Sequence, residues 1–168
     1  MPMPQWKQIT FTLPNSTIPP LILIRSVEGG NWYKRSELGF ATITNRTIVG
    51  IPILGGTNRT YYRGEIVTLC TEEQWTIFEE IKNTQRTRYE SLQDGHIILK
   101  DEYHYCTQSE ASKNSRAIVS GSTINTSVAG ITKSYCQYPV YIEPSDDHLP
   151  YDGGRDWWPL SFSFQELP

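Results

Sequence analysis

The sequence predicts a mainly β fold of the α+β class, a β-barrel or β-sandwich with one packed α-helix. Short segments that alternate apolar and polar residues, or that are continuously apolar and β-branched, recur along the chain between turns rich in glycine, proline and asparagine. Only one segment, near the middle of the chain, has the apolar spacing of a helix. Many short strands with a single helix are typical of a barrel or sandwich that the helix caps.

The predicted helix spans residues 71–85. Thr71 fits an N-cap, and Gln74 completes a capping box three residues later. Glu72 and Glu73 place negative charge in the first turn, where the helix dipole favours it. An apolar stripe follows, made of Trp75, Phe78 and Ile81. We expect this stripe to plug the barrel, so that Trp75→Ala costs about 3–5 kcal/mol and abolishes folding.

Several strands are expected before the helix, at residues 8–13, 21–24, 40–44, 48–54 and 65–70. In the first of them Ile9, Phe11 and Leu13 alternate with polar residues, which indicates a half-buried strand. Leu21–Ile24 is continuously apolar, and we expect it to be covered on both faces. Pro52 indicates an edge position or a bulge in the strand that contains it.

The helix is followed by a polar connection, residues 83–95, whose last two residues form a hairpin-type turn signal. Further strands are expected at residues 96–99, at residues 135–142 and at the C-terminus. In the last strand Leu160, Phe162 and Phe164 alternate with serine and glutamine, so that one face is apolar. These strands bracket the helix and complete the predicted barrel.

The chain fits a single domain over residues 1–168 with two elaborations. Residues 107–131 are expected to form a flexible arm or insertion. Within it, residues 107–116 have the composition of a mobile surface loop, and residues 117–131 that of short exposed strands or an extended arm. Residues 143–156 form an acidic loop rich in proline and glycine. Neither elaboration is needed for a minimal barrel.

The charge balance argues against two classes of partner. With 15 basic and 18 acidic residues the net charge is -3, too small to favour binding to nucleic acid or to a membrane surface. No apolar run is long enough to span a membrane, and the first residues lack the pattern of a signal peptide. We therefore expect a reducing cytoplasm and free, mostly buried cysteines, since three scattered cysteines do not form a disulfide framework.

The best metal candidates are His104, Cys106 and Cys136, because His104 and Cys106 share a face of an extended strand. The paired spacing of structural zinc ligands is absent, so buried thiols and a surface histidine are the preferred interpretation. Aspartates in the acidic loop lack the calcium-loop pattern, and a solvated loop is preferred. These aspartates are Asp146, Asp147, Asp152 and Asp156.

Motifs for nucleophilic catalysis and for phosphate binding are missing from the sequence. Cys70 lies at the start of the predicted helix, where the dipole lowers a thiol pKa, but a small buried residue at the end of a strand is the preferred role. We expect neither enzymatic activity nor a cofactor.

Arginines and aromatic residues gather around the central helix and near the C-terminus. Together with Arg35 they suggest either a surface for single-stranded nucleic acid or a protein interface, and the net charge favours the interface. The candidate interface residues are Arg59, Tyr61, Tyr62, Arg63, Arg86, Arg88, Tyr89, Trp157 and Trp158.

The stretch Ile51–Tyr103 resembles the tail-tip proteins of phages, the minor tail or distal-tail proteins. The resemblance rests on I-L-G-G, an aromatic strand, T-E-E-Q-W with an aromatic residue three positions later, and the strand I-I-L-K-D-E-Y. The C-terminal W-W-P-L-S-F-S-F-Q-E-L resembles their closing strand. These are structural patterns and not catalytic signatures, and they cover about two thirds of the chain.

The resemblance implies a structural virion protein, assembled in the host cytoplasm into a homo-oligomeric ring, commonly a hexamer, at the tail tip or baseplate. Its implied partners are other phage tail proteins. Besides an enzyme of the metal-dependent hydrolase class, which is the least favoured interpretation, two alternatives remain open from the sequence. One is a neck or tail-completion protein, and the other is a small ligand-binding or glycan-binding β-domain that uses Trp157 and Trp158.

Overall fold

The computed structural model of the protein describes residues 7–24, 32–38, 42–46, 52–55, 60–122, 124–125, 130–143 and 157–167. Within these ranges the chain forms eleven strands and two helices. The elements are β1 (Gln8–Thr12), β2 (Leu21–Ile24), β3 (Tyr33–Leu38), β4 (Thr42–Arg46), β5 (Pro52–Gly55), β6 (Tyr61–Cys70), α1 (Glu72–Glu90), β7 (Ile97–Thr107), α2 (Gln108–Lys113), β8 (Ala117–Ile118), β9 (Ile124–Asn125), β10 (Thr132–Ile142) and β11 (Trp158–Glu166). The predicted mainly β class is confirmed.

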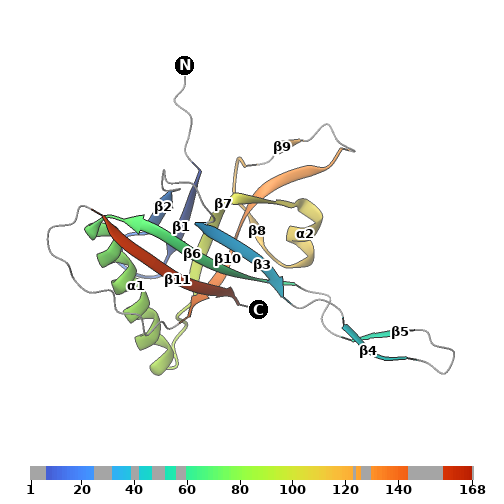
Figure 1. Cartoon of the computed structure of the whole chain (residues 1–168), viewed down its shortest axis with the longest axis horizontal. Coiled ribbons are helices and arrows are strands. Elements are labelled where there is room, and N and C mark those ends of the chain that lie inside the picture. The colour runs from blue at the N-terminus through green and yellow to red at the C-terminus, as the bar shows by residue number, and fades with distance from the viewer. Residues whose placement is uncertain are drawn as a thin grey trace, which may run out of the picture.

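The main sheet is antiparallel and curls into a half-barrel (Figure 1). Its strand order is β2-β1-β7-β10-β11-β6-β3, and the short strands β8 and β9 both pair with β10. Helix α1 packs against β2, β6 and β11. Strands β4 and β5 form a separate two-stranded sheet that projects from the half-barrel (Figure 1). The helices of the described ranges are too short or too polar to cross a membrane.

The core joins the alternating apolar residues of the strands to one face of α1. The Phe11 ring meets the rings of Phe162 and Phe164 edge-on, with centroids 5.4 and 5.6 Å apart. Phe78 of α1 reaches Phe162 at 4.7 Å. These rings contribute both buried area and favourable edge-to-face contacts. The alternation predicted for the first and last strands is therefore what builds the core.

The start of α1 is as predicted, and its end is not. The Thr71 hydroxyl accepts a hydrogen bond from Gln74 N at 3.2 Å, and Gln74 Oε1 accepts one from Thr71 N at 2.9 Å. The helix, however, continues to Glu90 instead of ending near Gln85. Gln85 is buried and pairs twice with the backbone of Ile142, at 2.9 and 3.0 Å. The partner of Gln85 lies far along the chain, so the local sequence does not show it. For this reason the polar residues after the apolar stripe were predicted to form a connection and not the end of the helix.

A second helix lies where a mobile loop was predicted. Helix α2 begins with its own capping box, in which Thr107 accepts from Glu110 N and Glu110 accepts from Thr107 N. Ala111 is its buried residue and fixes it to the core. The loop prediction is wrong here because the capping signal was outweighed by the lack of large apolar residues. The short strands expected within residues 117–131 are confirmed as β8 and β9.

Strand β2 differs from its prediction in burial. Leu21 and Leu23 are buried, whereas Ile22 and Ile24 are 40% and 49% exposed. The prediction of cover on both faces is wrong because β2 is an edge strand of the half-barrel and faces the core on one side only. The strands predicted at 40–44 and 48–54 are shifted to β4 and β5, and Pro52 opens the second of them. Strand β3 was not predicted.

Candidate functional site

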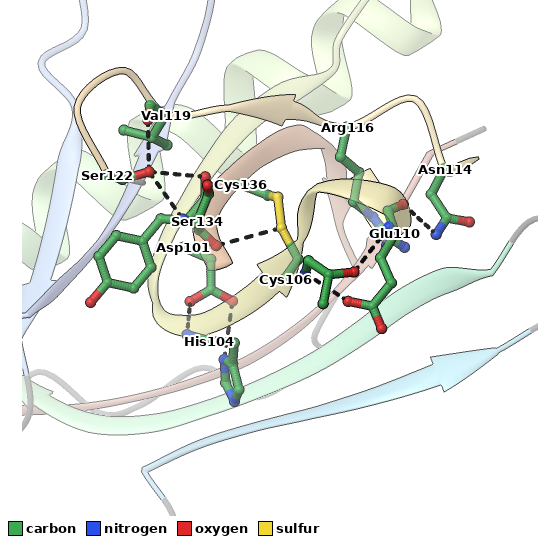
Figure 2. The surroundings of a disulfide bond; sticks show 12 residues. Asp101, His104, Cys106, Glu110, Asn114, Arg116, Val119, Ser122, Ser134 and Cys136 are labelled. Carbon is green, nitrogen blue, oxygen red and sulfur yellow. Dashed lines mark hydrogen bonds and ion pairs between the residues drawn. A yellow bond between two sulfur atoms is a disulfide. The ribbon is translucent and has the colours of Figure 1, made fainter. Parts of the chain in front are cut away.

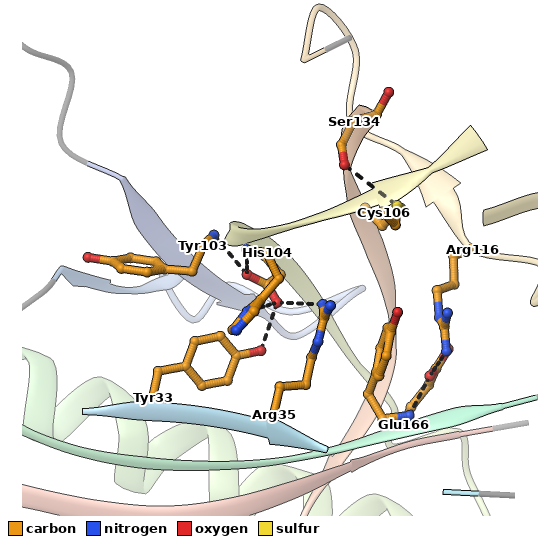
Figure 3. Close-up of polar contacts among 11 residues, drawn as sticks. Tyr33, Arg35, Tyr103, His104, Cys106, Arg116, Ser134 and Glu166 are labelled. Atoms are coloured by element: carbon orange, nitrogen blue, oxygen red, sulfur yellow. Dashed lines mark hydrogen bonds and ion pairs between the residues drawn. A yellow bond between two sulfur atoms is a disulfide. The ribbon is translucent and has the colours of Figure 1, made fainter. Parts of the chain in front are cut away.

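Charged and phenolic side chains meet inside the half-barrel and form the most organised polar site of the described residues (Figure 3). The site, called the buried polar cluster here, consists of Tyr33, Arg35, Tyr62, Asp101, His104, Arg116, Tyr138 and Glu166. These residues come from β3, β6, β7, β10 and β11 and from the turn between α2 and β8.

Asp101 lies at the centre of one half of the cluster, and its side chain is fully buried. Its Oδ2 accepts from Tyr33 Oη at 2.7 Å and from Arg35 Nη1 at 3.0 Å, and it lies 3.1 Å from His104 Nδ1. Its Oδ1 accepts from the backbone N–H groups of Tyr103 and His104. A buried carboxylate with this many donors is compensated for the loss of its hydration.

A β-bulge creates this geometry. Asp101 pairs with Cys136 across the sheet and Tyr105 pairs with Tyr135, so that residues 102–104 bulge out of the register between them. The bulge turns two backbone N–H groups back onto the carboxylate of Asp101. It also presents His104 next to Tyr33 of β3, with ring centroids 4.7 Å apart.

The titration of the buried groups follows from their surroundings. Burial alone raises the pKa of Asp101, but the hydrogen bond from His104 and the charge of Arg35 outweigh it and hold that pKa below the usual value. Burial, together with the nearby Tyr138 and Asp101, raises the pKa of Tyr33 well above that of a free phenol. Asp101 is therefore the anion of this half of the cluster and Tyr33 a neutral donor to it.

The other half of the cluster is a stack of Tyr62 between two arginines. The guanidinium carbons of Arg35 and Arg116 lie 3.8 and 3.7 Å from the centroid of the Tyr62 ring. Two groups at this distance from one centroid must occupy opposite faces of the ring, since both do not fit on one. Cation–π contacts of this kind are strengthened by desolvation.

Glu166 balances the charge of Arg116. Its carboxylate accepts from Arg116 Nε at 2.9 Å and from Nη2 at 2.8 Å, and it also accepts from Tyr62 N at 2.8 Å. Arg116 Nη2 further donates to Thr60 O at 2.9 Å, while its Nη1 is buried without a hydrogen-bond partner among the described residues. These bonds tie the α2–β8 turn to the last residues of β11.

The contacts of the cluster are directed at one another, and this limits its chemistry. Asp101 and His104 form the carboxylate–imidazole pair that hydrolases use to activate a nucleophile. Among the described residues, the hydrogen bonds of His104 go to Asp101 and not to a serine, threonine or cysteine. The geometry supports a structural role, in which the ion pairs Arg35–Asp101 and Arg116–Glu166 connect the strands of the half-barrel.

The three predicted metal candidates are placed differently from the expectation (Figure 2). Cys106 and Cys136 form a disulfide, so the expectation of free thiols is wrong for this pair. Neighbouring strands bring their side chains together, which the sequence spacing does not show. His104 binds Asp101, and the described residues hold no group of three or more histidine, cysteine or acidic side chains arranged for a metal ion. The acidic loop at 144–156 lies outside the described residues.

Cys70 is the free cysteine of the described chain. It ends β6 and is buried, as predicted. Burial raises the pKa of its thiol to about 11, which outweighs any lowering by the start of α1. Cys70 is thus a core residue and not a reactive thiol.

The predicted interface residues divide into three groups. Tyr62 and Trp158 are buried, Trp158 stacking on Trp75 with centroids 6.1 Å apart, so neither presents a surface in this structure. Arg63 and Arg88 are engaged within the chain, with Glu143 at 2.9 Å and with the carbonyl of Pro14 at 2.8 Å. Tyr61, Arg86, Tyr89 and Trp157 face solvent at least in part, as does Arg63, whose side chain is 48% exposed. Arg59 lies outside the described residues.

Strand phase contains the signal that separates these groups. Tyr62 is in phase with Ile66 and Cys70, and all of them face the core. The opposite phase of β6 exposes Val67 and Leu69, at 59% and 45%. Exposed apolar residues at alternate positions of one strand mark a candidate contact surface that composition alone misses.

A second exposed feature lies beside the disulfide. The rings of Tyr105 and Tyr135 stack with centroids 4.6 Å apart, and Tyr135 Oη donates to Tyr105 Oη at 3.0 Å.

Comparison of the chain with protein-family models, with curated proteins and with solved structures gives no match. The geometry of the chain itself therefore has to support a function.

Proposed function

We propose that this protein is a structural subunit of a phage tail, at the tail tip or baseplate, and that it acts by binding other tail proteins and further copies of itself. The observation that carries the proposal is the β4–β5 hairpin. Its strands pair with each other, and no other strand of the described residues joins them. It projects from the half-barrel (Figure 1).

A two-stranded hairpin on its own is marginally stable in water, because it buries too little apolar surface to offset its conformational entropy. This hairpin nevertheless contains Ile43, Ile53 and Leu54 within its strands. Such a hairpin gains stability when a further chain covers it. A projecting hairpin of this kind suits a protein that contacts its neighbours in an assembly.

The body of the protein supports the same function. Val67 and Leu69 expose an apolar face of β6, and Trp157 is 57% exposed. The charged residues of the buried polar cluster form ion pairs with one another, and these pairs stiffen the half-barrel. A rigid body with exposed apolar positions and a projecting arm suits a ring. The resemblance of Ile51–Tyr103 to tail-tip proteins supplies the class, the location in the virion and the expectation of six copies.

The test is co-expression with the products of the genes on either side, followed by affinity purification and negative-stain electron microscopy. We expect retention of tail proteins and ring-shaped particles. A variant with residues 42–55 replaced by a short Gly-Ser linker loses them. Leu92→Asn is the matched control, because Leu92 is almost fully exposed outside the hairpin and its positive φ suits asparagine. A strict monomer that retains no neighbouring product contradicts the proposal.

A further inference from the structure

Two tyrosines face each other across β7 and β10 on the outer side of the sheet. Tyr105 of β7 and Tyr135 of β10 are direct partners in the antiparallel register. The residues that follow them, Cys106 and Cys136, are buried and joined by the disulfide. Successive side chains of a strand point to opposite faces, so the disulfide lies on the inner face and the tyrosines on the outer one. The disulfide therefore fixes the two strands beside the tyrosine pair.

The two rings are arranged for contact between their phenol groups. They are almost parallel, with an interplanar angle of 11° and centroids 4.6 Å apart, and Tyr135 Oη donates to Tyr105 Oη at 3.0 Å. Each ortho carbon of a phenol is bonded to the carbon that carries the hydroxyl, so this hydrogen bond also brings the ortho edges of the rings together. Tyr105 is 38% exposed, and a soluble oxidant can reach it.

Other tyrosine pairs of the described residues have a different geometry. Tyr89 and Tyr141 meet edge-on, with an interplanar angle of 72° and centroids 5.2 Å apart. Tyr62 and Tyr138 are tilted by 54° at 5.5 Å, and both are buried. In this part of the chain neither pair is joined by a hydrogen bond between its hydroxyl groups. A parallel stack with linked hydroxyls thus distinguishes the exposed pair on β7 and β10.

We propose that Tyr105 and Tyr135 form an oxidative crosslinking site, at which hydrogen peroxide and a haem peroxidase couple the two phenols into dityrosine. Each phenol gives up one electron and its hydroxyl proton, and the two phenoxyl radicals join through an ortho carbon of each ring. The hydrogen on each of these carbons then moves to the oxygen and restores the hydroxyl. The two electrons and two protons that leave convert one molecule of peroxide into two of water.

The structure favours coupling within the chain over coupling between chains. Two reacting groups held in contact react as one unit, without the entropy cost of an encounter. The product is a carbon–carbon bond between β7 and β10, which thiol reagents do not break. It closes a loop of the same length as the disulfide does, since the separation is 30 residues in both cases. The crosslinking site does not depend on the proposed assembly function.

The test treats the full chain with a haem peroxidase and a limiting amount of hydrogen peroxide. After reduction and alkylation of the cysteines, tryptic peptides are analysed by mass spectrometry. We expect the peptides that contain Tyr105 and Tyr135 to be joined, with the loss of two hydrogen atoms and with dityrosine fluorescence. The yield should not change when the protein is diluted. Tyr105→Phe and Tyr135→Phe keep the rings but lack a phenol, so each should lower the fluorescence at least roughly tenfold.

Tyr89→Phe is the matched control, because Tyr89 is also 38% exposed but belongs to the edge-on pair. It should leave the yield unchanged. After reduction by dithiothreitol, the crosslinked chain should unfold at a higher urea concentration than the untreated chain, because its loop stays closed. Absence of the joined peptides, dityrosine that persists in both phenylalanine variants at these positions, or crosslinks found only between chains would overturn the inference.

Discussion

The guanidinium of Arg116 donates to the carboxylate of Glu166 at 2.9 and 2.8 Å, and both side chains are shut off from solvent. The pair joins the turn after α2 to the end of β11, across 50 residues of sequence. Because desolvation of two charges offsets most of their attraction, the pair adds little net stability when intact. Removal of only one partner, in contrast, leaves the other charge buried and unpaired.

Arg116→Met should destabilise the protein by about 3–5 kcal/mol, because it leaves Glu166 charged, buried and unpaired. The double variant Arg116→Met with Glu166→Leu should recover a large part of this loss. Urea unfolding of the single and double variants measures both effects as a double-mutant cycle. Arg86→Ala is the control, since Arg86 is 70% exposed and lies 4.0 Å from Glu90. Its effect should stay within about 0.5 kcal/mol, and an equal loss in both arginine variants would refute the tie.

Asp101 should make the stability depend on acid pH. Its pKa in the folded chain is lower than the roughly 3.9 of an unfolded aspartate, since the hydrogen bond from His104 and the charge of Arg35 outweigh the burial. The resulting stabilisation is complete above the unfolded pKa and is lost as the pH falls through the folded one. The free energy of unfolding should therefore drop below about pH 4.

Asp101→Asn should lower the stability at neutral pH and flatten this acid drop. The measurement is urea unfolding of both proteins between roughly pH 3 and 7. Asp94→Asn controls for a surface carboxylate whose pKa is also lowered, by its backbone and side-chain hydrogen bonds with His96, but which is fully exposed. Identical acid slopes for the native chain and Asp101→Asn would exclude Asp101 as the source.

The disulfide between Cys106 and Cys136 encloses α2, β8 and β9. Loop closure over a separation of 30 residues corresponds to about 3–4 kcal/mol in the chain-entropy description. Cys106→Ser with Cys136→Ser should reduce stability by up to about that amount. Dithiothreitol should lower the stability of the native chain and leave the double variant unaffected.

Thiol counting checks the same bond independently. The denatured, unreduced chain should react through Cys70 alone, and all three cysteines should react after reduction. In the folded chain Cys70 should react slowly at neutral pH, because burial raises the pKa of its thiol to about 11. Three reactive thiols in the denatured, unreduced protein would contradict the disulfide.

The local sequence pattern predicts the strands and the start of α1, because these features depend on residues that are neighbours in sequence. The alternation of Phe162 and Phe164 with polar residues and the capping box of Thr71 both appear in the structure as expected. The buried polar cluster has no such local signature. Arg35 and Asp101 are 66 residues apart, and nothing in the sequence around either one indicates the other. Pairing across the sheet decides such contacts, and the disulfide is missed for the same reason.

Composition does not separate interface residues from core residues, for a related reason. Arginine and tyrosine are common in interfaces and equally suit a buried stack of the kind that Tyr62 forms. Strand phase, and not residue type, distinguishes the two: Tyr62 shares the inward phase of Ile66, and Val67 has the outward one. Applied before the structure is known, phase would have moved Tyr62 to the core.

The same reasoning orders the residues of α1. The sequence predicts that the stripe of Trp75, Phe78 and Ile81 plugs the barrel and that Trp75→Ala abolishes folding. Trp75 is, however, only partly buried, and it stacks on Trp158. Phe78 is the deeper residue, with its ring against Phe162. Phe78→Ala should therefore cost about 3–5 kcal/mol, and Trp75→Ala should cost less and leave a folded protein.

Urea unfolding of the two alanine variants, with Thr76→Ala as an exposed control on the same helix, measures this order. The assembled state gives a second readout. If α1 only supports the half-barrel, Trp75→Ala should preserve self-association under conditions where the variant is folded. Complete unfolding of Trp75→Ala together with a mild effect of Phe78→Ala would reverse the order and restore Trp75 as the plug.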